Sequence, residues 1–107
     1  MSEDAHYTLL RTIEQNPGMS QRDLARALGI SLGKTNYCLK ALVEKGWVKM
    51  DNFSRNPEKL KYVYLLTPRG VKAKAGLTAR FFKRKLAEYE ALSSEIERLR
   101  AEIGKPS

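Results

Sequence analysis

The sequence has very little cysteine and histidine, the residues that build disulfides, zinc sites and histidine-based catalytic dyads. Of its 107 residues, one is cysteine and one is histidine. A single cysteine excludes an intrachain disulfide, and no cluster of His, Cys, Asp and Glu has the spacing of metal ligands. A phosphate-binding Gly-rich loop and a nucleophile elbow are also missing. We therefore expect no enzyme activity, no metal and no cofactor.

Long hydrophobic runs are absent as well. No apolar run approaches the roughly 20 residues that a transmembrane helix needs. The N-terminus, MSEDAHY, is polar and acidic, unlike a secretory signal. Because a lone cysteine also suits a reducing compartment, we expect a cytoplasmic protein with no membrane partner. The 42% of hydrophobic residues allow a packed core, and the length suits one domain with an appended helix.

Acidic residues are scarce in the middle of the chain. Residues 20–85 hold 16 Lys and Arg against four Asp and Glu, a net charge of +12. The flanking residues 1–19 and 86–107 each carry a net charge of −2. A basic field of this kind attracts polyanions and speeds their encounter. A basic surface kept for solubility is the alternative, but the charge coincides with a DNA-reading motif.

This motif lies in residues 20–49, SQRDLARALGISLGKTNYCLKALVEKGWVK, which combine two short helical patterns around one glycine. A capping box of the form Ser-Gln-Arg-Asp opens the first helix, and Leu24, Ala27 and Leu28 form its apolar stripe. Gly29 ends this helix, because glycine adopts a left-handed backbone without steric cost. Two helices joined by so short a turn form a helix-turn-helix, whose second helix enters the DNA major groove.

The second helix is expected over residues 32–45, with Ser31 as its cap and Gly46 at its end. Inward-facing Thr35, Leu39 and Leu42 would anchor this recognition helix. Its outward face, which we expect to contact DNA bases, consists of Gly33, Lys34, Asn36, Tyr37 and Lys40.

Each residue type on this face can contribute to a contact with DNA. Asn36 can pair with N6 and N7 of adenine, and Lys34 or Lys40 can donate to guanine or phosphate. Gly33 allows close approach of the backbone, and Tyr37 can contact a thymine methyl or a phosphate. For each single side chain, plain exposure on a solvated helix is the alternative. The prediction therefore concerns the DNA-binding role of the face as a whole rather than the role of any one side chain.

Two strand-like runs follow at residues 47–50 and 61–66, separated by a polar loop. Such a loop directly after a recognition helix is typical of a wing. Arg55 lies at its expected tip, where it can enter the minor groove or contact phosphate. Further phosphate contacts are expected from Lys59 and Lys61 and from the N–H groups at the start of the helix that precedes the turn, which are those of Ser20, Gln21 and Arg22.

The pair Thr67 and Pro68 is typical of a helix start, and the final helix is expected from there to about Ile103. Gly70 and Gly76 weaken its early part, which is compatible with a bend or break near Gly76. The later part carries a nearly heptad apolar stripe that predicts pairing with the same helix of a second chain. The stripe consists of Phe82, Leu86, Tyr89, Leu92, Ile96, Leu99 and Ile103.

Cys38 and Trp47 are the single cysteine and the single tryptophan of the chain. Each has a functional interpretation and a structural one. Cys38 is expected to be a small buried hydrophobe rather than a redox sensor. Trp47 is expected to fill the core at the junction of helix and strand rather than to stack on a ligand.

The segments GIS, LKAL and EKGWV, within residues 29–48, resemble winged-helix regulators of the MarR type. With YLLTPRG and AEYEAL, residues 6 to about 99 look closer still to the small MarR-family regulators associated with bacterial exopolysaccharide gene clusters. The resemblance implies a bacterial, homodimeric transcription regulator near genes of polysaccharide synthesis or export. The chain is shorter than larger MarR proteins, so their ligand pocket at the dimer interface is not carried over, and no effector is identified.

The sequence thus predicts a mainly α fold with a small β-hairpin wing. A winged helix-turn-helix DNA-binding domain is expected over residues 1–67 and a C-terminal dimerisation helix over 68–107, fraying from about residue 104. The expected function is sequence-specific binding of double-stranded DNA as a homodimeric transcription regulator. A protein–protein adaptor and a non-specific DNA-coating protein are the alternatives. An adaptor has little use for the basic charge, and a coating protein would show no sequence preference.

Overall fold

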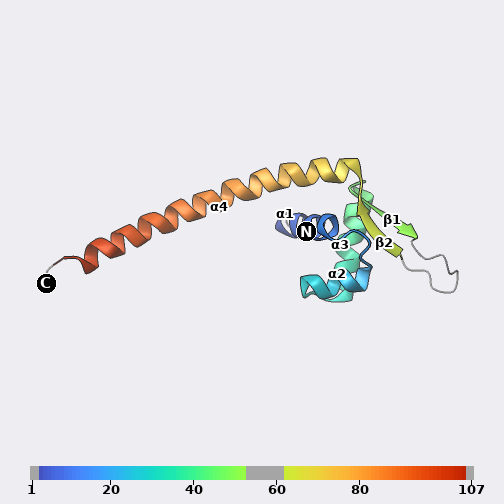
Figure 1. Cartoon of the computed structure of the whole chain (residues 1–107), viewed down its shortest axis with the longest axis horizontal. Coiled ribbons are helices and arrows are strands. Elements are labelled where there is room, and N and C mark those ends of the chain that lie inside the picture. The colour runs from blue at the N-terminus through green and yellow to red at the C-terminus, as the bar shows by residue number, and fades with distance from the viewer. Residues whose placement is uncertain (1–2, 53–61, 106–107) are drawn as a thin grey trace. The chain divides into compact units, whose positions relative to one another are not determined.

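A computed structural model describes residues 3–52 and 62–105 of the chain. The chain divides after Leu77 into two compact units, which are described separately. It is mainly helical with one two-stranded hairpin, so the predicted fold class is confirmed (Figure 1). The elements in chain order are α1 (Glu3–Gln15), α2 (Gln21–Leu28), α3 (Leu32–Glu44), β1 (Val48–Asn52), β2 (Tyr62–Leu66) and α4 (Pro68–Ile103).

The ends of α2 and α3 follow the local chemistry of their caps. The Ser20 hydroxyl accepts a hydrogen bond from the Asp23 N–H at 3.2 Å, and the Asp23 carboxylate accepts one from the Ser20 N–H at 3.1 Å. Gly29 has a left-handed backbone with φ of +65°. The Ser31 hydroxyl accepts from the Lys34 N–H at 3.1 Å. The predicted caps and the short turn between the helices are therefore confirmed.

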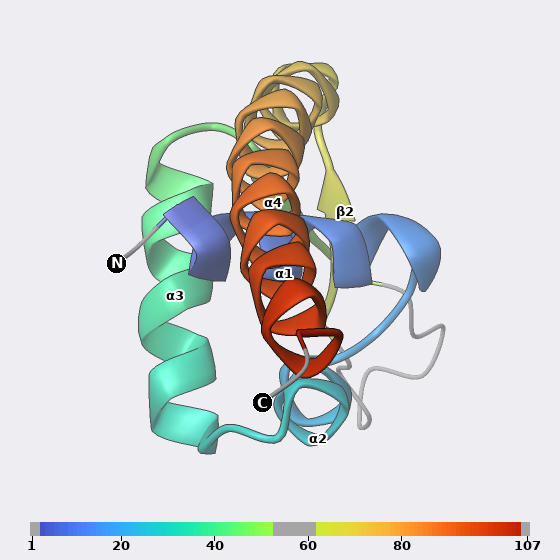
Figure 2. The same ribbon diagram turned by 90° about the vertical axis from the view of Figure 1, so that its left-hand side faces the viewer.

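The first unit is built around one core. In it, α2 packs on both α1 and α3, and α1 also packs on β2 (Figure 2). Cys38 is among the core residues, as expected of a small hydrophobe, and half-buried Trp47 packs against them. The buried cluster consists of Leu9, Leu10, Ile13, Leu24, Cys38, Leu39, Leu42, Val48, Tyr64 and Leu77.

One residue of the expected apolar stripe of α2 was placed wrongly. Leu24 is fully buried, but the second buried residue is Ala25, whereas Ala27 is exposed. Leu28 is half-buried against the core. The buried face is turned toward Ala25 because the eight-residue helix contacts both α1 and α3. Because Ala25 and Ala27 are only two residues apart and have the same side chain, helical periodicity alone does not show which of them is buried.

The hairpin pairs β1 and β2 antiparallel, with Val48 opposite Leu66 and Asn52 opposite Tyr62. The Tyr64 N–H donates to the Met19 carbonyl at 3.2 Å, which ties the turn between α1 and α2 to β2. The first strand was predicted one residue too early. Trp47 instead donates its N–H to the Leu42 carbonyl at 3.0 Å, closing the end of α3.

The first turn of α4 is fixed by Thr67, whose hydroxyl accepts from the Gly70 N–H at 3.0 Å and donates to the Gly46 carbonyl at 2.6 Å. Gly70 is buried, and a Cβ at this position would lie 1.9 Å from the Trp47 carbonyl oxygen. Only glycine permits this close approach. The helix continues without a break through Gly76 to Ile103.

Candidate nucleic-acid interface

The rotation of α3 is set by its buried face. Thr35, Leu39 and Leu42 are buried to within 1% of full burial, and the Thr35 hydroxyl donates to the Ser31 carbonyl at 2.8 Å. The opposite face is thereby turned outward, as the sequence predicted. It presents exposed Gly33, Lys34, Tyr37 and Lys40 together with half-buried Asn36.

The cations of this face are not neutralised by neighbours. Neither Lys34 nor Lys40 forms an ion pair with any residue that the structure describes. Lys45, at the far end of the helix, lies with its Nζ 5.1 Å from the centre of the Trp47 ring. Two lysines near the beginning and middle of α3 therefore keep their charge for an anionic partner.

A groove of about 370 Å³ lies between α3 and the hairpin. Asn36 and Lys40 line it from the helix, and Met50 and Tyr64 line it from the strands. Met50 is 54% exposed, and Val43, which also lines the groove, is 36% exposed. Sequence reasoning missed both apolar residues, because periodicity does not show which side chains of two elements meet. They give the groove an apolar strip beside its polar residues.

Two of the three side chains at the beginning of α2 are hydrogen-bonded within the protein. The Ser20 hydroxyl is engaged with Asp23, to which it also donates at 2.8 Å. The Gln21 amide donates to the Leu32 carbonyl at 3.3 Å, so it links the start of α2 to the start of α3. Arg22 is exposed. Of the three residues expected to hold phosphate here, Arg22 is thus the one whose side chain extends into solvent.

Three of the predicted phosphate contacts lie outside the described residues. These are the wing residues Arg55, Lys59 and Lys61. The strands on either side of this segment are described, and their last described pair is Asn52 opposite Tyr62.

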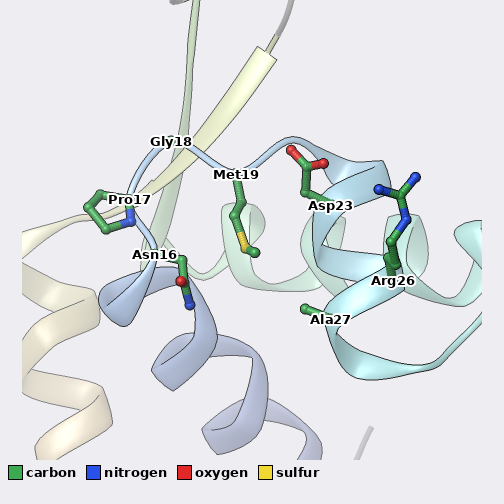
Figure 3. A pocket seen from close by; sticks show the side chains of 7 residues that line it. All are labelled: Asn16, Pro17, Gly18, Met19, Asp23, Arg26 and Ala27. Atoms are coloured by element: carbon green, nitrogen blue, oxygen red, sulfur yellow. The ribbon is translucent and has the colours of Figure 1, made fainter.

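A hollow of about 450 Å³ lies between the end of α1 and α2 (Figure 3). Asp23 and Arg26 extend from α2, and Asn16 and Pro17 come from the end of α1 and the turn after it. The Asp23 carboxylate is already bound to Ser20 in the capping box. The hollow therefore contains no carboxylate free for acid–base chemistry.

Residues 3–52 and 62–105 lack two features of other kinds, a metal site and a membrane-spanning helix. Within these ranges no group of three or more His, Cys, Asp and Glu could hold a metal ion. No helix in the same ranges is both long and apolar enough to cross a membrane.

The second unit, residues 78–107, consists largely of the remainder of α4. Seven large apolar side chains on this helix are between 43% and 87% exposed. They are the seven residues of the predicted stripe, Phe82, Leu86, Tyr89, Leu92, Ile96, Leu99 and Ile103. An exposed apolar stripe of this length is typical of a surface that binds another protein.

Comparison with known proteins agrees with this geometry. Residues 3–49 match the family model for winged helix-turn-helix DNA-binding domains. A search of curated protein sequences gave no match. Residues 3–49 therefore lie within a winged helix-turn-helix fold, as the sequence predicted.

Solved structures of MarR-type regulators share the fold. The MepR–DNA complex of S. aureus superimposes with a TM-score of 0.72 at 20% identity, covering 94% of this chain and 73% of MepR. Apo MarR from E. coli gives a TM-score of 0.67 at 19% identity, covering 94% of this chain and 76% of MarR. The PcaV regulator of Streptomyces coelicolor gives 0.67 at 19% identity, with coverages of 92% and 76%.

Proposed function

We propose that this protein is a sequence-specific DNA-binding transcription regulator that acts as a homodimer. The observation that carries the proposal is the outward face of α3, which is anchored by three buried residues and presents an amide, two lysines and a tyrosine. It lies within the segment of the chain that carries a net charge of +12. The fold supports the proposal, since one structure that shares it, MepR of S. aureus, was determined with DNA.

In this proposal one group of residues recognises bases and a second group contacts phosphates. Asn36, Tyr37, Lys34 and Lys40 choose the sequence by contacts in the major groove, and Gly33 lets the helix approach closely. The second group, which holds the phosphates, consists of Arg22 on α2 and of Arg55, Lys59 and Lys61 of the wing.

The apolar stripe of α4 supplies the homodimer. A helix with seven exposed large apolar residues on one side needs a partner, and a second copy is the simplest one. A dimer whose two recognition helices bind one face of the duplex requires half-sites about 10 bp apart, or a multiple of this spacing. We infer further, from the family resemblance of the sequence, that the protein acts in the bacterial cytoplasm on exopolysaccharide-related genes.

Selection of bound sites from random-sequence duplex DNA tests the proposal, with the full chain at about 0.15 M salt. Enrichment of a two-fold symmetric motif is the expected result. Binding without enrichment would favour a DNA-coating protein, since only the charge would then contribute. Absence of binding would favour a protein–protein adaptor.

A pair of variants shows whether α3 makes the contacts. Lys34→Gln removes one positive charge from the outward face of α3, and Lys72→Gln removes one from an exposed position of α4. We expect the first to weaken binding to the selected site at least as strongly as one lost phosphate contact does, and the second to have little effect. Equal effects of the two variants would contradict the assignment of α3 as the recognition helix.

A further inference from the structure

We propose that α4 pairs with α4 of a second copy in parallel and in register, as a two-stranded coiled coil. This inference rests on the proposed homodimer and adds the orientation of its two chains. The pairing surface is the exposed stripe of the second unit. Its residue types favour two strands, and the charges beside it favour one orientation.

From Tyr89 onward the stripe follows a strict heptad. Tyr89, Ile96 and Ile103 are seven residues apart and occupy the a positions, and Leu92 and Leu99 occupy the d positions. All five side chains are at least 44% exposed in the single chain. Among parallel coiled coils, isoleucine at a combined with leucine at d favours two strands over three or four.

The charged residues beside the stripe distinguish the parallel from the antiparallel orientation. The g positions are Glu88, Glu95 and Glu102, so that all three carry a carboxylate. The e positions of the two heptads are Ser93 and Arg100. In a parallel pair, each g position faces the following e position of the other helix. Glu95 of each copy then meets Arg100 of the other, which gives two attractive contacts by symmetry.

An antiparallel pair would bring like charges together. In that arrangement the g row of one helix lies along the g row of the other, and every g residue is a glutamate. Glutamates facing glutamates repel each other. Exposed pairs contribute little to stability, and the Arg100 and Glu88 side chains are 73% and 65% exposed. The charges therefore choose the orientation, while the apolar stripe drives association.

The orientation has a consequence for DNA binding. In a parallel pair the two copies of Thr78 lie at the same end of the coil, and residues 3–77 of each chain continue directly from it. An antiparallel pair that aligns Leu92 with Ile96 would separate the two copies of Thr78 by roughly 50 Å at 1.5 Å per residue. A parallel pair thus starts both DNA-binding units from one place, which suits a short palindromic operator.

Disulfide trapping in the full chain distinguishes the orientations. In a Cys38→Ala background, which removes the only cysteine, one chain carries Ile103→Cys and another carries Lys85→Cys. Position 103 is an a position, and position 85 is a d position when the same heptad is continued toward the N-terminus, so both face the other helix. In parallel register each position faces its own copy, and positions 85 and 103 lie roughly 27 Å apart. In the antiparallel arrangement that pairs Leu92 with Ile96, position 85 faces position 103.

The two chains are tested singly and mixed, under a glutathione redox buffer, by non-reducing gel and mass spectrometry. We expect each chain to crosslink to itself and the mixture to give no disulfide between positions 85 and 103. A disulfide only between the two different positions would overturn the parallel arrangement while the homodimer stands. A monomer by light scattering would overturn the homodimer itself, so the two failures are distinguishable.

Charge reversal gives an independent test. Arg100→Glu places one glutamate opposite each Glu95 of the parallel dimer, in two symmetric contacts, and we expect the dimer dissociation constant to rise roughly tenfold at low salt. Arg98→Glu makes the same charge change at an outward c position and is expected to have a much smaller effect. The double variant Glu95→Arg with Arg100→Glu should restore dimerisation. If Arg100→Glu weakens the dimer no more than Arg98→Glu, the parallel register is refuted.

Discussion

Asn36 is the residue of α3 whose chemistry best suits the choice of a base. Its amide can donate to and accept from one adenine edge, and its half-buried position beside the groove limits its conformations. We expect Asn36→Ala to relax specificity at one or two base positions per half-site, by about 1–3 kcal/mol. Binding to duplexes that differ from the selected site by single base pairs measures this.

The matched control is Asn16→Ala, which removes an exposed asparagine from the end of α1. That amide donates to the Thr12 carbonyl at 3.1 Å, and the variant should keep the full preference for the selected site. A uniform loss of affinity across all duplexes in Asn36→Ala would mean that Asn36 contacts phosphate instead of a base.

Gly70 is required by packing rather than by backbone conformation. Because an added Cβ would meet the Trp47 carbonyl oxygen at 1.9 Å, both backbones would have to move apart. We expect Gly70→Ala to lower the free energy of unfolding by about 2 kcal/mol or more, measured by urea denaturation. Gly33→Ala is the control, since a Cβ there has no neighbour within 4 Å; a helical alanine should leave stability unchanged or slightly raised. Equal stability of the two variants would contradict this account.

His6 makes the stability of the first unit depend on pH. Burial, and then the nearby Lys45 ammonium, lower the pKa of His6 below its usual 6.5. Its ring lies edge-on to Trp47 at 5.8 Å, and its Nε2 is buried without a hydrogen-bond partner among the described residues. The unfolded chain therefore binds a proton more readily than the folded one. This contribution to stability is complete above the unfolded pKa and is lost as the pH falls below it.

We accordingly expect the urea midpoint to fall between about pH 7.5 and pH 5.5, and to fall less in His6→Gln, which cannot be protonated in this range. The two proteins share every other titratable group, so the difference between their pH profiles isolates the contribution of the histidine. Identical pH profiles would show that His6 is as readily protonated in the folded protein as in the unfolded one.

At the scale of elements, the start of α2 depends on the reciprocal bonds between Ser20 and Asp23. Ser20→Ala removes the oxygen that accepts from the Asp23 N–H. We expect a loss of about 1 kcal/mol in the free energy of unfolding, whereas Ser20→Thr keeps the acceptor and should retain most of the stability. Thermal unfolding followed by circular dichroism gives both values. A Thr variant as unstable as the Ala variant would argue against the cap as the cause.

The elements differ in how well the sequence predicted them. The starts of α2, α3 and α4 were predicted correctly, because a capping residue acts on N–H groups two or three positions away. Two details failed. Ala27 is exposed because the contacts of α2 with α1 and α3 decide which of its faces is buried. Trp47 closes α3 by a bond to Leu42, five residues earlier, instead of beginning a strand. No break occurs at Gly76, since one glycine costs a long helix only about 1 kcal/mol.

At the scale of the whole molecule, dimerisation and DNA binding should be coupled. Leu92→Glu places a charge in the exposed stripe of α4, and we expect a monomer by light scattering, with affinity for the two-fold site reduced by a factor of 10 or more. Ala91→Glu makes the same charge change at the neighbouring exposed position outside the stripe and should remain dimeric. A dimeric Leu92→Glu protein would remove the stripe from the interface.

The candidate site was also predictable only in part. Helical periodicity placed the five residues of the recognition face on the exposed side of α3, because buried Thr35, Leu39 and Leu42 fix its rotation. It did not predict that the Gln21 amide is bound to the Leu32 carbonyl or that Met50 lines a groove with Asn36. Each of these contacts joins two elements whose distance no local pattern encodes.

The sequence by itself determined the order of the elements, their caps, the helix-turn-helix and the heptad stripe, since these depend on interactions within a few residues along the chain. Tertiary structure decided which face of α2 is buried, that Gly70 must lack a side chain, and that α3 and the hairpin share a groove. These features depend on how closely separate elements approach in the core. The distance between two elements depends on how the side chains of all the elements in the core pack together. The spacing of residues along one segment does not predict this packing.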